Sequence, residues 1–442
     1  MPVRISFIGA GSYGFTYKLV ADILYIEALA DCEFVFMDID EQRLENLKTI
    51  LSCYFPKVGY NKKATYTTDR ADALRGADFV VNLVKIGLME ACHYDMELPQ
   101  KFGLYQTIGD TSGLGGIFRG IRTMIFDIKL CREMEELSAD GAVVLNYTNP
   151  QATSVMAVSN VSHIPFIGLC HSVQGTTRNM ARLLNVPYER VNFDAAGINH
   201  MSWILKYEVD GEDYYPKLKE IVKERGIFFE DESDETIVTP FGPVRLDMLN
   251  RTGYMVTESS HHFAEYVPFY LRTGELREKY KLPINRYVRN VAKKERMYGD
   301  LVRKALSNEL PHQKKSFEYG SRIIESMVTN KPCKIYANVM NEGIITNLPT
   351  NSAVEAACLV DKNGVQPCNF GKLPAHLAML CNMEINSHQM VVHAVLENDK
   401  DYILYALMAD PATHSVLDLD QMREIAYELI EMEKKYLDGY FA

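Results

Sequence analysis

The N-terminal segment narrows the possible folds more than any other part of the chain. Residues 3–8 form an almost continuous apolar run, which is typical of a parallel strand buried on both faces. Residues 9–14 (GAGSYG) follow at once and match the pattern G-x-G-x-x-G, and apolar residues at helical spacing come next. A strand, a glycine turn and a helix in this order predict a βαβ unit that binds a dinucleotide at the N-terminus of the helix.

A carboxylate at the end of the second expected strand supports the same interpretation. Residues 33–37 form another apolar run, and Asp38 follows it, where a carboxylate accepts hydrogen bonds from ribose hydroxyls. The next two residues, Ile39 and Asp40, include no Arg that could neutralise a 2′-phosphate, which favours NAD over NADP. The residues that we predict to bind NAD are Gly9, Gly11, Gly14 and Asp38.

Further apolar runs at residues 78–84, 142–145 and 165–169 alternate with helical patterns, which predicts a parallel sheet covered on both faces. Later segments read as an antiparallel strand at 203–209 and as longer helices. The expected fold class is therefore α/β: a Rossmann-type, doubly wound domain at residues 1–195 and a mixed α+β domain at residues 196–442. This architecture is similar to that of lactate and malate dehydrogenases. An acidic stretch at 231–235 is expected to be an exposed loop.

Composition excludes several classes of protein. The 442 residues include 47 Lys and Arg against 58 Asp and Glu, a net charge of −11, which argues against a nucleic-acid partner. Nine cysteines without a CxxC pair indicate reduced thiols, not a disulfide framework. Residues 141–177 lack charged side chains but contain too many Asn, Gln and Pro residues to span a membrane. We expect a cytoplasmic protein that does not bind membranes.

A cysteine and two histidines follow extended segments in the middle of the chain. Cys170 comes directly after the run at 165–169, His171 is next, and His200 ends another extended segment. Cys170 and His200 predict a two-ligand metal site with positions left open for substrate oxygens. A buried structural thiol and a hydrogen-bonded histidine remain the ordinary alternative.

Two more polar segments are candidate parts of the site. Asn149 precedes a proline, which holds it extended, and it is placed to hydrogen-bond nicotinamide or a sugar hydroxyl. Residues 257–266 gather two carboxylates, two histidines and a tyrosine in one short stretch, which is typical of a site loop, although a solvated loop would look similar. We therefore predict that both segments contribute to the site.

Several motifs together resemble those of glycoside hydrolase family 4. They are GDTSGLGGIFRGIRT at 109–123, NYTNP at 146–150, GLCHSVQGT at 168–176, AGINHM at 196–201, VTESSHHFAEY at 256–266 and ACLVD at 357–361. Within the family, the sequence CHSV at 170–173 is similar to that of the α-galactosidase (melibiase) subgroup. The turn at 12–14 departs from that subgroup, because Ser-Tyr-Gly replaces its usual Ser-Thr-Ile.

The resemblance implies an unusual mechanism, because family 4 does not follow the two-carboxylate scheme of most glycosidases. It implies that NAD⁺ oxidises C3 of the sugar, that a base removes the acidified C2 proton, that the C1–O bond breaks by elimination, and that water then adds. It also implies that Cys170 and His200 bind Mn²⁺, that His171 protonates the leaving oxygen, and that Asn149 contacts the substrate. For the C2 base it leaves Tyr266 and Glu258 open, and Tyr266 is slightly favoured.

Alternatives remain within the family and outside it. The leading expectation is an α-galactosidase that hydrolyses small α-galactosides such as melibiose and works as a homodimer or homotetramer. An α-galacturonidase or an α-glucosidase is the nearest competitor, and a uronate would need a basic clamp. The arginines that could supply this clamp are Arg119, Arg122, Arg286 and Arg289. From other classes, an NAD-dependent 2-hydroxyacid dehydrogenase would have no need of Cys170, and an NAD-bound sensor or scaffold would have no need of the polar segment at 256–266.

Overall fold

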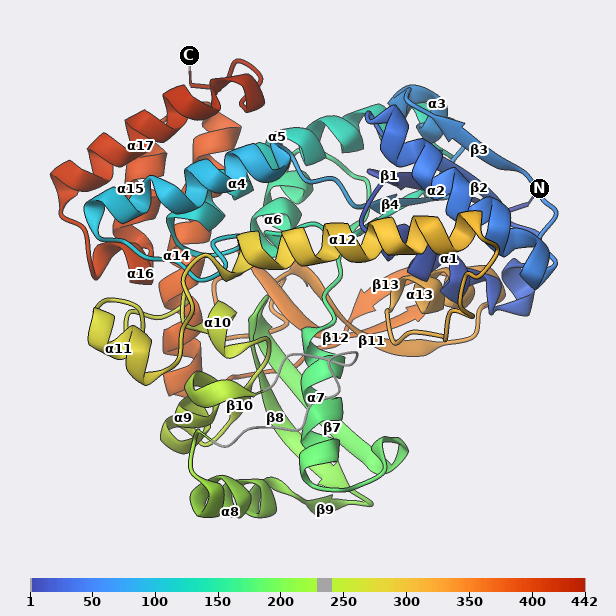
Figure 1. Ribbon diagram of the computed structural model, residues 1–442. Coiled ribbons are helices and arrows are strands. Elements are labelled where there is room, and N and C mark those ends of the chain that lie inside the picture. The colour runs from blue at the N-terminus through green and yellow to red at the C-terminus, as the bar shows by residue number, and fades with distance from the viewer. Residues whose placement is uncertain (1, 229–240, 442) are drawn as a thin grey trace.

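The computed structural model describes residues 2–228 and 241–441 (Figure 1). Thirteen strands of these residues form one mixed sheet, whose N-terminal part has the order β3-β2-β1-β4-β5-β6 with all neighbours parallel. This is the strand order of dinucleotide-binding folds, so the predicted Rossmann-type sheet is confirmed. The six strands are β1 (Arg4–Ile8), β2 (Glu33–Met37), β3 (Ala64–Thr67), β4 (Phe79–Asn82), β5 (Val143–Asn146) and β6 (Phe166–Gly168).

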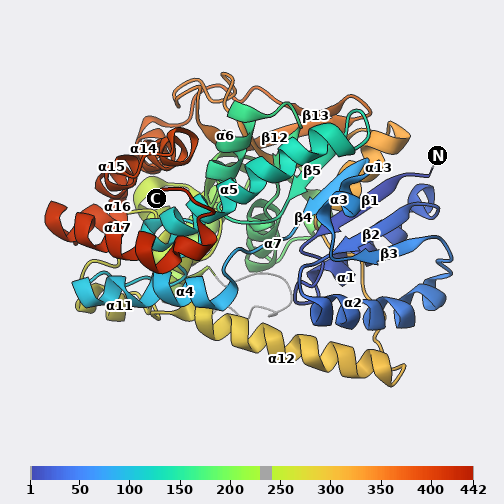
Figure 2. The same cartoon turned by 90° about the horizontal axis from the view of Figure 1, so that it is seen from above.

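The parallel sheet forms because its strands are apolar on both faces. In β2, Phe34 and Phe36 enter one core with α1 and α2, whereas Val35 and Met37 enter the other core with α3 and α5. Helices therefore cover both faces of the sheet, as the view from above shows (Figure 2). The helices of this part are α1 (Phe15–Leu24), α2 (Glu41–Tyr54), α3 (Arg70–Leu74), α4 (Leu88–Glu97), α5 (Gly113–Leu137), α6 (Gln151–Val161) and α7 (Ser172–Leu183).

The sheet continues beyond β6 with antiparallel strands. Gly168 of β6 pairs with Asn338 of β11, and the order then runs β11-β12-β7-β8-β10, with β13 beside β12 and β9 beside β8. The predicted domain boundary at 195/196 falls inside β7, so the two predicted domains share one sheet. These strands are β7 (Val191–Ile198), β8 (Met201–Val209), β9 (Glu212–Asp213), β10 (Met255–Val256), β11 (Cys333–Met340), β12 (Ala353–Asp361) and β13 (Gly364–Pro367).

The remaining helices surround this second part. The long helix α12 crosses the front of the molecule and packs on α2, and α14 packs on α5 and α6 (Figure 1). The helix expected at 316–328 begins only at Gly320, because Asp22 accepts the backbone N–H of Ser316 at 2.7 Å and holds the preceding residues in a loop. The helices are α8 (Tyr215–Arg225), α9 (Gly242–Thr252), α10 (Ser260–Phe263), α11 (Gly274–Lys279), α12 (Arg286–Leu306), α13 (Gly320–Thr329), α14 (Ala375–Glu397), α15 (Asp401–Ala409), α16 (Pro411–His414) and α17 (Leu419–Glu433).

Three expectations from composition concern membrane-spanning helices, the cysteines and an acidic loop. Within residues 2–228 and 241–441, no helix combines the length and the apolar character that crossing a membrane requires. All nine cysteines are free thiols, as predicted. The acidic stretch expected as a loop at 231–235 lies outside the described residues.

Candidate active site

The glycine turn and Asp38 lie together at the carboxyl ends of β1 and β2. Gly9 has a φ of +78°, and a Cβ on it would lie 2.9 Å from the backbone nitrogen of Val84. A Cβ on Gly11 would lie 2.8 Å from Oδ2 of Asp38, the same oxygen that accepts the backbone N–H of Gly11 at 2.7 Å. Gly14 directly precedes α1. The cradle is therefore open only as long as these positions carry no side chain, which fits a dinucleotide phosphate close to the backbone.

Arg43 of α2 joins this turn and was missed in the sequence. Its guanidinium lies 4.8 Å from the ring centre of Tyr13, and it donates hydrogen bonds to the Tyr13 hydroxyl at 3.1 Å and to the Gly11 carbonyl at 3.3 Å. Tyr13 is one of the residues at which the turn departs from the subgroup. The departure thus comes with its own partner, a cation–π contact that fixes Tyr13 beside the cradle.

Three predicted residues converge where the parallel and antiparallel parts of the sheet meet. Cys170 follows β6, His200 lies in the two-residue turn between β7 and β8, and Glu258 follows β10. One ligand atom from each of these three residues lies within 4.8 Å of the others. A thiol sulfur, an imidazole nitrogen and a carboxylate oxygen form a donor set that suits a divalent transition-metal ion.

Backbone strain marks the same cluster. His200 has a φ of +64° and Glu258 a φ of +67°, so both adopt the left-handed conformation that residues with a Cβ seldom occupy. Each such position costs about 1–3 kcal/mol and persists only where the surrounding structure imposes it. The fold thus holds two of the three convergent side chains in place against their local preference.

Burial sets the protonation of the two ligands that the sequence predicted. It lowers the pKa of His200 to about 4, so the imidazole is neutral and has a lone pair to give to a metal ion. Burial also raises the pKa of the Cys170 thiol well above its ordinary value, and the charges of Glu355 and Glu258 add to this effect. A bound cation would lower this pKa, so the thiol fits a site that holds one.

A chain of polar side chains extends from His200 toward Asn149. Nδ1 of His262 lies 3.1 Å from Nδ1 of His200, and its Nε2 lies 3.9 Å from Asp110. Asp110 forms a buried ion pair with Arg119 at 3.2 Å, and Nε of Arg119 donates to the Asn149 carbonyl at 3.2 Å. Asp110 and His262 occur in the motifs at 109–123 and 256–266, but nothing in the sequence indicated that they meet. Such outer partners orient metal ligands and tune their basicity.

Tyr266 lies beside this chain, and its hydroxyl has no hydrogen-bond partner. The side chain is 1% exposed, and its ring centre is 6.3 Å from that of His200. Burial, followed by the charges of Glu384, Asp110 and other carboxylates, raises its pKa well above the ordinary value. The hydroxyl of Tyr266 is therefore available to a hydrogen-bond partner beside the cluster of Cys170, His200 and Glu258.

Glu265 has a different role, although it belongs to the same segment. Its carboxylate accepts the backbone N–H groups of Thr107, Ile108 and Gly109 at 2.7 to 3.1 Å. It thereby fixes the loop that carries Asp110 to the N-terminus of α5. The crowded polar segment at 257–266 therefore contributes both site groups and the support for a neighbouring loop.

Glu355 is a further residue that the sequence analysis missed. It lies on β12 opposite Gly197, is fully buried, and neither carboxylate oxygen has a hydrogen-bond partner. Burial, with the charge of Glu258, raises its pKa to about 8. A single acidic residue inside an apolar run, AVEAACLV at 353–360, was the signal available for it.

His171 and Asn149 lie at the edge of the cluster. His171 immediately precedes α7, its side chain is 53% exposed, and its Nδ1 is 3.9 Å from Glu318, a buried carboxylate that Lys18 contacts at 2.8 Å. Asn149 follows β5 and is half-buried, next to a cis peptide bond to Pro150. The half-exposed position gives His171 access to a group that enters from solvent.

The four arginines proposed as a uronate clamp differ in their burial and in their contacts. Arg122 is 2% exposed and pairs with both Asp95 and Glu433, so its charge is already matched. Arg119 belongs to the polar chain, and Arg286 lies 2.9 Å from Nε2 of His261. Arg289 is exposed. Only Arg119 and Arg286 have the contacts to act near the cluster.

Comparison with known proteins identifies the family. Residues 4–186 match the model described as family 4 glycosyl hydrolase, and residues 195–413 match that of the family 4 glycosyl hydrolase C-terminal domain. The chain belongs to glycosyl hydrolase family 4. It is 37% identical to an alpha-galactosidase of Bacillus subtilis over 99% of both chains.

Two further family 4 comparisons extend this finding. The chain is 27% identical to an alpha-galacturonidase of Thermoanaerobacter italicus over 99% of this chain and 98% of that protein. A 6-phospho-alpha-glucosidase from gut microorganisms, whose crystal structure contains NAD and Mn²⁺, has the same fold with a TM-score of 0.83. It is 22% identical, and the match covers 99% of each chain. The α/β architecture of this chain is therefore that of the family 4 enzymes.

Proposed function

We propose that this family 4 enzyme is an NAD- and Mn²⁺-dependent α-galactosidase that acts on small α-galactosides such as melibiose. The observation that carries the proposal is the meeting of Cys170, His200 and Glu258 beside the unpartnered hydroxyl of Tyr266. The relative named alpha-galactosidase, at 37% identity over the full length, supports the sugar.

The residues of the chain fit both cofactors. Gly9, Gly11, Gly14 and Asp38 would hold NAD, and Cys170 and His200, joined by Glu258, would hold the metal ion. When bound, NAD supplies a reversible hydride acceptor for C3 of the sugar, and Mn²⁺ supplies Lewis-acid stabilisation of negative charge. NAD and Mn²⁺ in the crystal structure of the related 6-phospho-alpha-glucosidase support this assignment.

Each site side chain then has one task. Tyr266 removes the proton from C2, since its hydroxyl has no partner in the protein and the positive charge of a bound metal ion would offset the rise of its pKa. Glu258 faces the two metal ligands and completes their donor set. His171 protonates the oxygen of the leaving group from its half-exposed position. Asn149 holds a sugar hydroxyl, and Arg119 fixes its backbone.

A panel of nitrophenyl glycosides with Mn²⁺, NAD⁺ and a reductant tests the proposal. We expect nitrophenol release from the α-galactoside without net accumulation of NADH, and exchange of deuterium at C2 with solvent. Accumulation of NADH in proportion to substrate would instead establish a dehydrogenase. Products that keep all of the C2 label would exclude elimination.

An α-galacturonidase is the second candidate, favoured by the contact of Arg286 with His261 and by the relative of that name. A higher kcat/KM for the nitrophenyl α-galacturonide than for the α-galactoside would decide for it. Arg286→Gln should then remove the preference. The α-glucosidase alternative predicts a preference for the α-glucoside in the same panel.

The setting of the enzyme completes the proposal. Nine free cysteines support a reducing, cytoplasmic location. The homodimer or homotetramer stays a prediction, and light scattering after size-exclusion chromatography tests it.

A further inference from the structure

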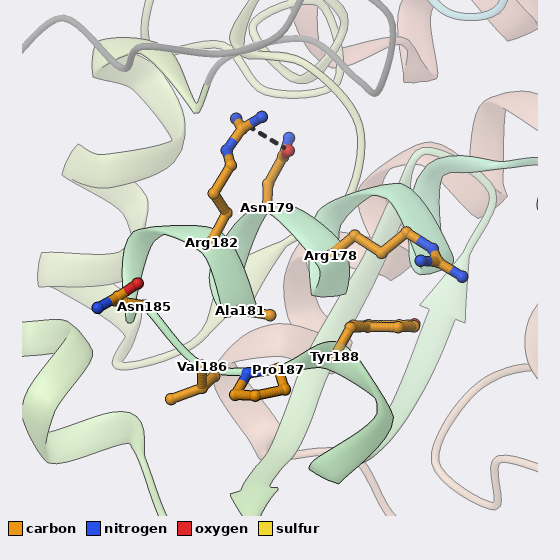
Figure 3. A pocket seen from close by; sticks show the side chains of 8 residues that line it. All are labelled: Arg178, Asn179, Ala181, Arg182, Asn185, Val186, Pro187 and Tyr188. Atoms are coloured by element: carbon orange, nitrogen blue, oxygen red, sulfur yellow. Dashed lines mark hydrogen bonds between the residues drawn. The ribbon is translucent and has the colours of Figure 1, made fainter.

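A cavity of about 350 Å³ opens next to the proposed active site, and the proposed function does not use it. It lies between α7, the start of β7, the segment before α13, and β11. The side chains that matter for its chemistry are Gln174, Arg178, Tyr188, Phe317 and Arg322. Figure 3 shows two of these residues, Arg178 and Tyr188, from a neighbouring hollow, with the guanidinium of Arg178 above the ring of Tyr188.

The cavity begins next to the residues of the proposed leaving-group step. Gln174 donates from Nε2 to the carbonyl oxygen of Cys170 at 3.3 Å, and its side chain is 4% exposed. Its Oε1 has no hydrogen-bond partner, so a buried acceptor is left over for a ligand hydroxyl. His171 lies 3.9 Å from Glu318, and the residue before Glu318, Phe317, lines the cavity. The cavity therefore lies on the side of the departing group.

Its charge is positive and unmatched. Arg178 lies 4.1 Å from the ring centre of Tyr188 and 5.4 Å from that of Phe317, and its buried Nε has no hydrogen-bond partner. Across residues 2–228 and 241–441, neither Arg178 nor Arg322 forms an ion pair, whereas Lys334, which also lines the cavity, pairs with Asp194 at 2.9 Å. The guanidinium of Arg178 is partly buried against two rings and has no carboxylate partner in the described part of the chain. An incoming anion would pair with it.

Spacing along α7 limits the size of the ligand. Arg178 comes seven residues after His171, which corresponds to about 10 Å along a helix axis. One hexose unit with a charged substituent bridges such a distance from the scissile oxygen. Arg178 is thus placed to meet a substituent on the first sugar beyond the bond that is cleaved.

We propose that this cavity binds the leaving group of the substrate, and that this leaving group carries a carboxylate or phosphate that Arg178 and Arg322 contact. Oε1 of Gln174 accepts a hydrogen bond from a hydroxyl of the same sugar. The inference rests on the proposed function, because it takes the leaving-group side from the role of His171. It deepens that function by naming a substrate class, an α-galactoside with an anionic aglycone.

Three substrates of the holoenzyme test the inference through galactose release. They are melibiose, melibionic acid, which ends in a carboxylate, and melibiose phosphorylated at O1 of its glucose unit. We expect kcat/KM to be at least ten times higher for one or both anionic substrates than for melibiose. The arm with the higher value identifies the anion. Equal or lower values for both anionic substrates would overturn the proposal.

Variants connect the preference to the cavity. Arg178→Gln should abolish the preference and leave hydrolysis of nitrophenyl α-galactoside within about twofold, since that aglycone carries no anion. Arg322→Gln, at an exposed position, should weaken the preference without a risk to folding. Arg182→Gln is the control, because Arg182 does not line this cavity and its guanidinium lies toward Asn179, away from Tyr188 (Figure 3). A preference that survives in both the Arg178 and Arg322 variants would overturn the proposal.

A binding measurement separates this inference from the proposed function. Calorimetric titration with gluconate and with glucose 1-phosphate, whose O6 is free as in the leaving group of melibiose, should show binding to the wild type and at least tenfold weaker binding to Arg178→Gln. If no α-galactoside is hydrolysed but this binding occurs, the proposed function fails and the anion site stands. If neither compound binds, the anion site is excluded whatever the enzyme hydrolyses.

Discussion

Two buried polar clusters of this enzyme differ in how their charges are matched. Arg122 of α5 pairs with Asp95 of α4 at 2.7 Å and with Glu433 of α17, so a buried cation meets two carboxylates within the protein. Cys170, His200 and Glu258 instead bring three potential metal-ligand atoms within 4.8 Å of one another. The first cluster is matched by its own side chains, whereas the second has the donor set that a divalent cation would complete.

The largest expected effect is the loss of activity when the second cluster loses its sulfur. Cys170→Ser should reduce turnover by about 1000-fold or more, because Lewis-acid stabilisation is worth several kcal/mol. NAD binding should be unchanged, since the glycine turn is separate from the thiol. Steady-state rates with and without Mn²⁺ test this prediction. Cys131→Ser, at a buried thiol of α5, is the matched control. Full turnover in the Cys170 variant would remove that residue from the site.

A substitution in the cluster of Arg122, Asp95 and Glu433 should lower the free energy of unfolding and leave kcat of the folded enzyme nearly unchanged. Arg122→Met leaves two buried carboxylates without their cation, so we expect a loss of about 3–5 kcal/mol in the free energy of unfolding. Urea denaturation measures it. Arg190→Met, which breaks an exposed pair with Asp210, should leave the free energy of unfolding almost unchanged. A change in kcat of the folded Arg122 variant similar to that of Cys170→Ser would contradict the distinction between the clusters.

Substitution of Tyr266 should lower the rate of the reaction without a loss of stability. Tyr266→Phe should lower the rate of C2 exchange by about 100-fold, as expected when a general base is removed. The same change removes an unpartnered buried hydroxyl, so stability should stay equal or rise by up to about 1 kcal/mol. Tyr270→Phe is the control, because its hydroxyl donates to Asp247 at 2.9 Å and its loss should cost stability but not exchange. Unchanged exchange in the Tyr266 variant would move the base to another residue.

Metal binding should stabilise only a chain with an intact second cluster. Mn²⁺ at about ten times its Kd should add about 1.4 kcal/mol to the free energy of unfolding of the wild type. The melting temperature of Cys170→Ser should not move, and that of Arg122→Met should rise as in the wild type. Thermal melts at constant NAD measure this. An equal shift in the wild type and the Cys170 variant would place the metal elsewhere.

The smallest expected effect concerns Asp127, a buried carboxylate that belongs to neither cluster. Asp127 accepts a hydrogen bond from Asn82 at 2.8 Å, has one oxygen without a partner, and burial raises its pKa to about 7. Because the folded pKa lies above the unfolded one, ionisation destabilises the fold as pH rises from about 4 to about 7. Asp127→Asn should therefore stabilise the protein by about 1 kcal/mol or more at pH 8 and have little effect at pH 4. Urea melts at both pH values test the sign, and a larger gain at pH 4 would contradict it.

The sequence predicted the parts of the fold that depend on neighbouring residues. The apolar run at 33–37 is β2 to the residue, and the glycine turn with Asp38 lies where the pattern required. The helix α12 went unnoticed because its buried residues, Val291, Tyr298 and Ala305, are seven residues apart on an otherwise polar helix. Local patterns thus predicted strands and turns better than a helix with a narrow apolar face.

The active site was predicted only where a residue had its own local signal. Cys170 and His200 stood out because each follows an extended segment. Asp110, His262 and Glu355 did not, since their significance comes from contacts between segments that are far apart in the chain. The left-handed φ of His200 likewise depends on the turn between two strands that only the folded sheet brings together.

The continuous sheet has a consequence for turnover. Because β6 pairs with β11 at Gly168, one sheet connects the glycine turn with the segment that carries Cys170. We therefore expect substrate entry and product departure to depend on loop and side-chain motions more than on domain opening. Cys170 lies only two residues after Gly168, so its sulfur atom is near the point where the two parts of the sheet are joined.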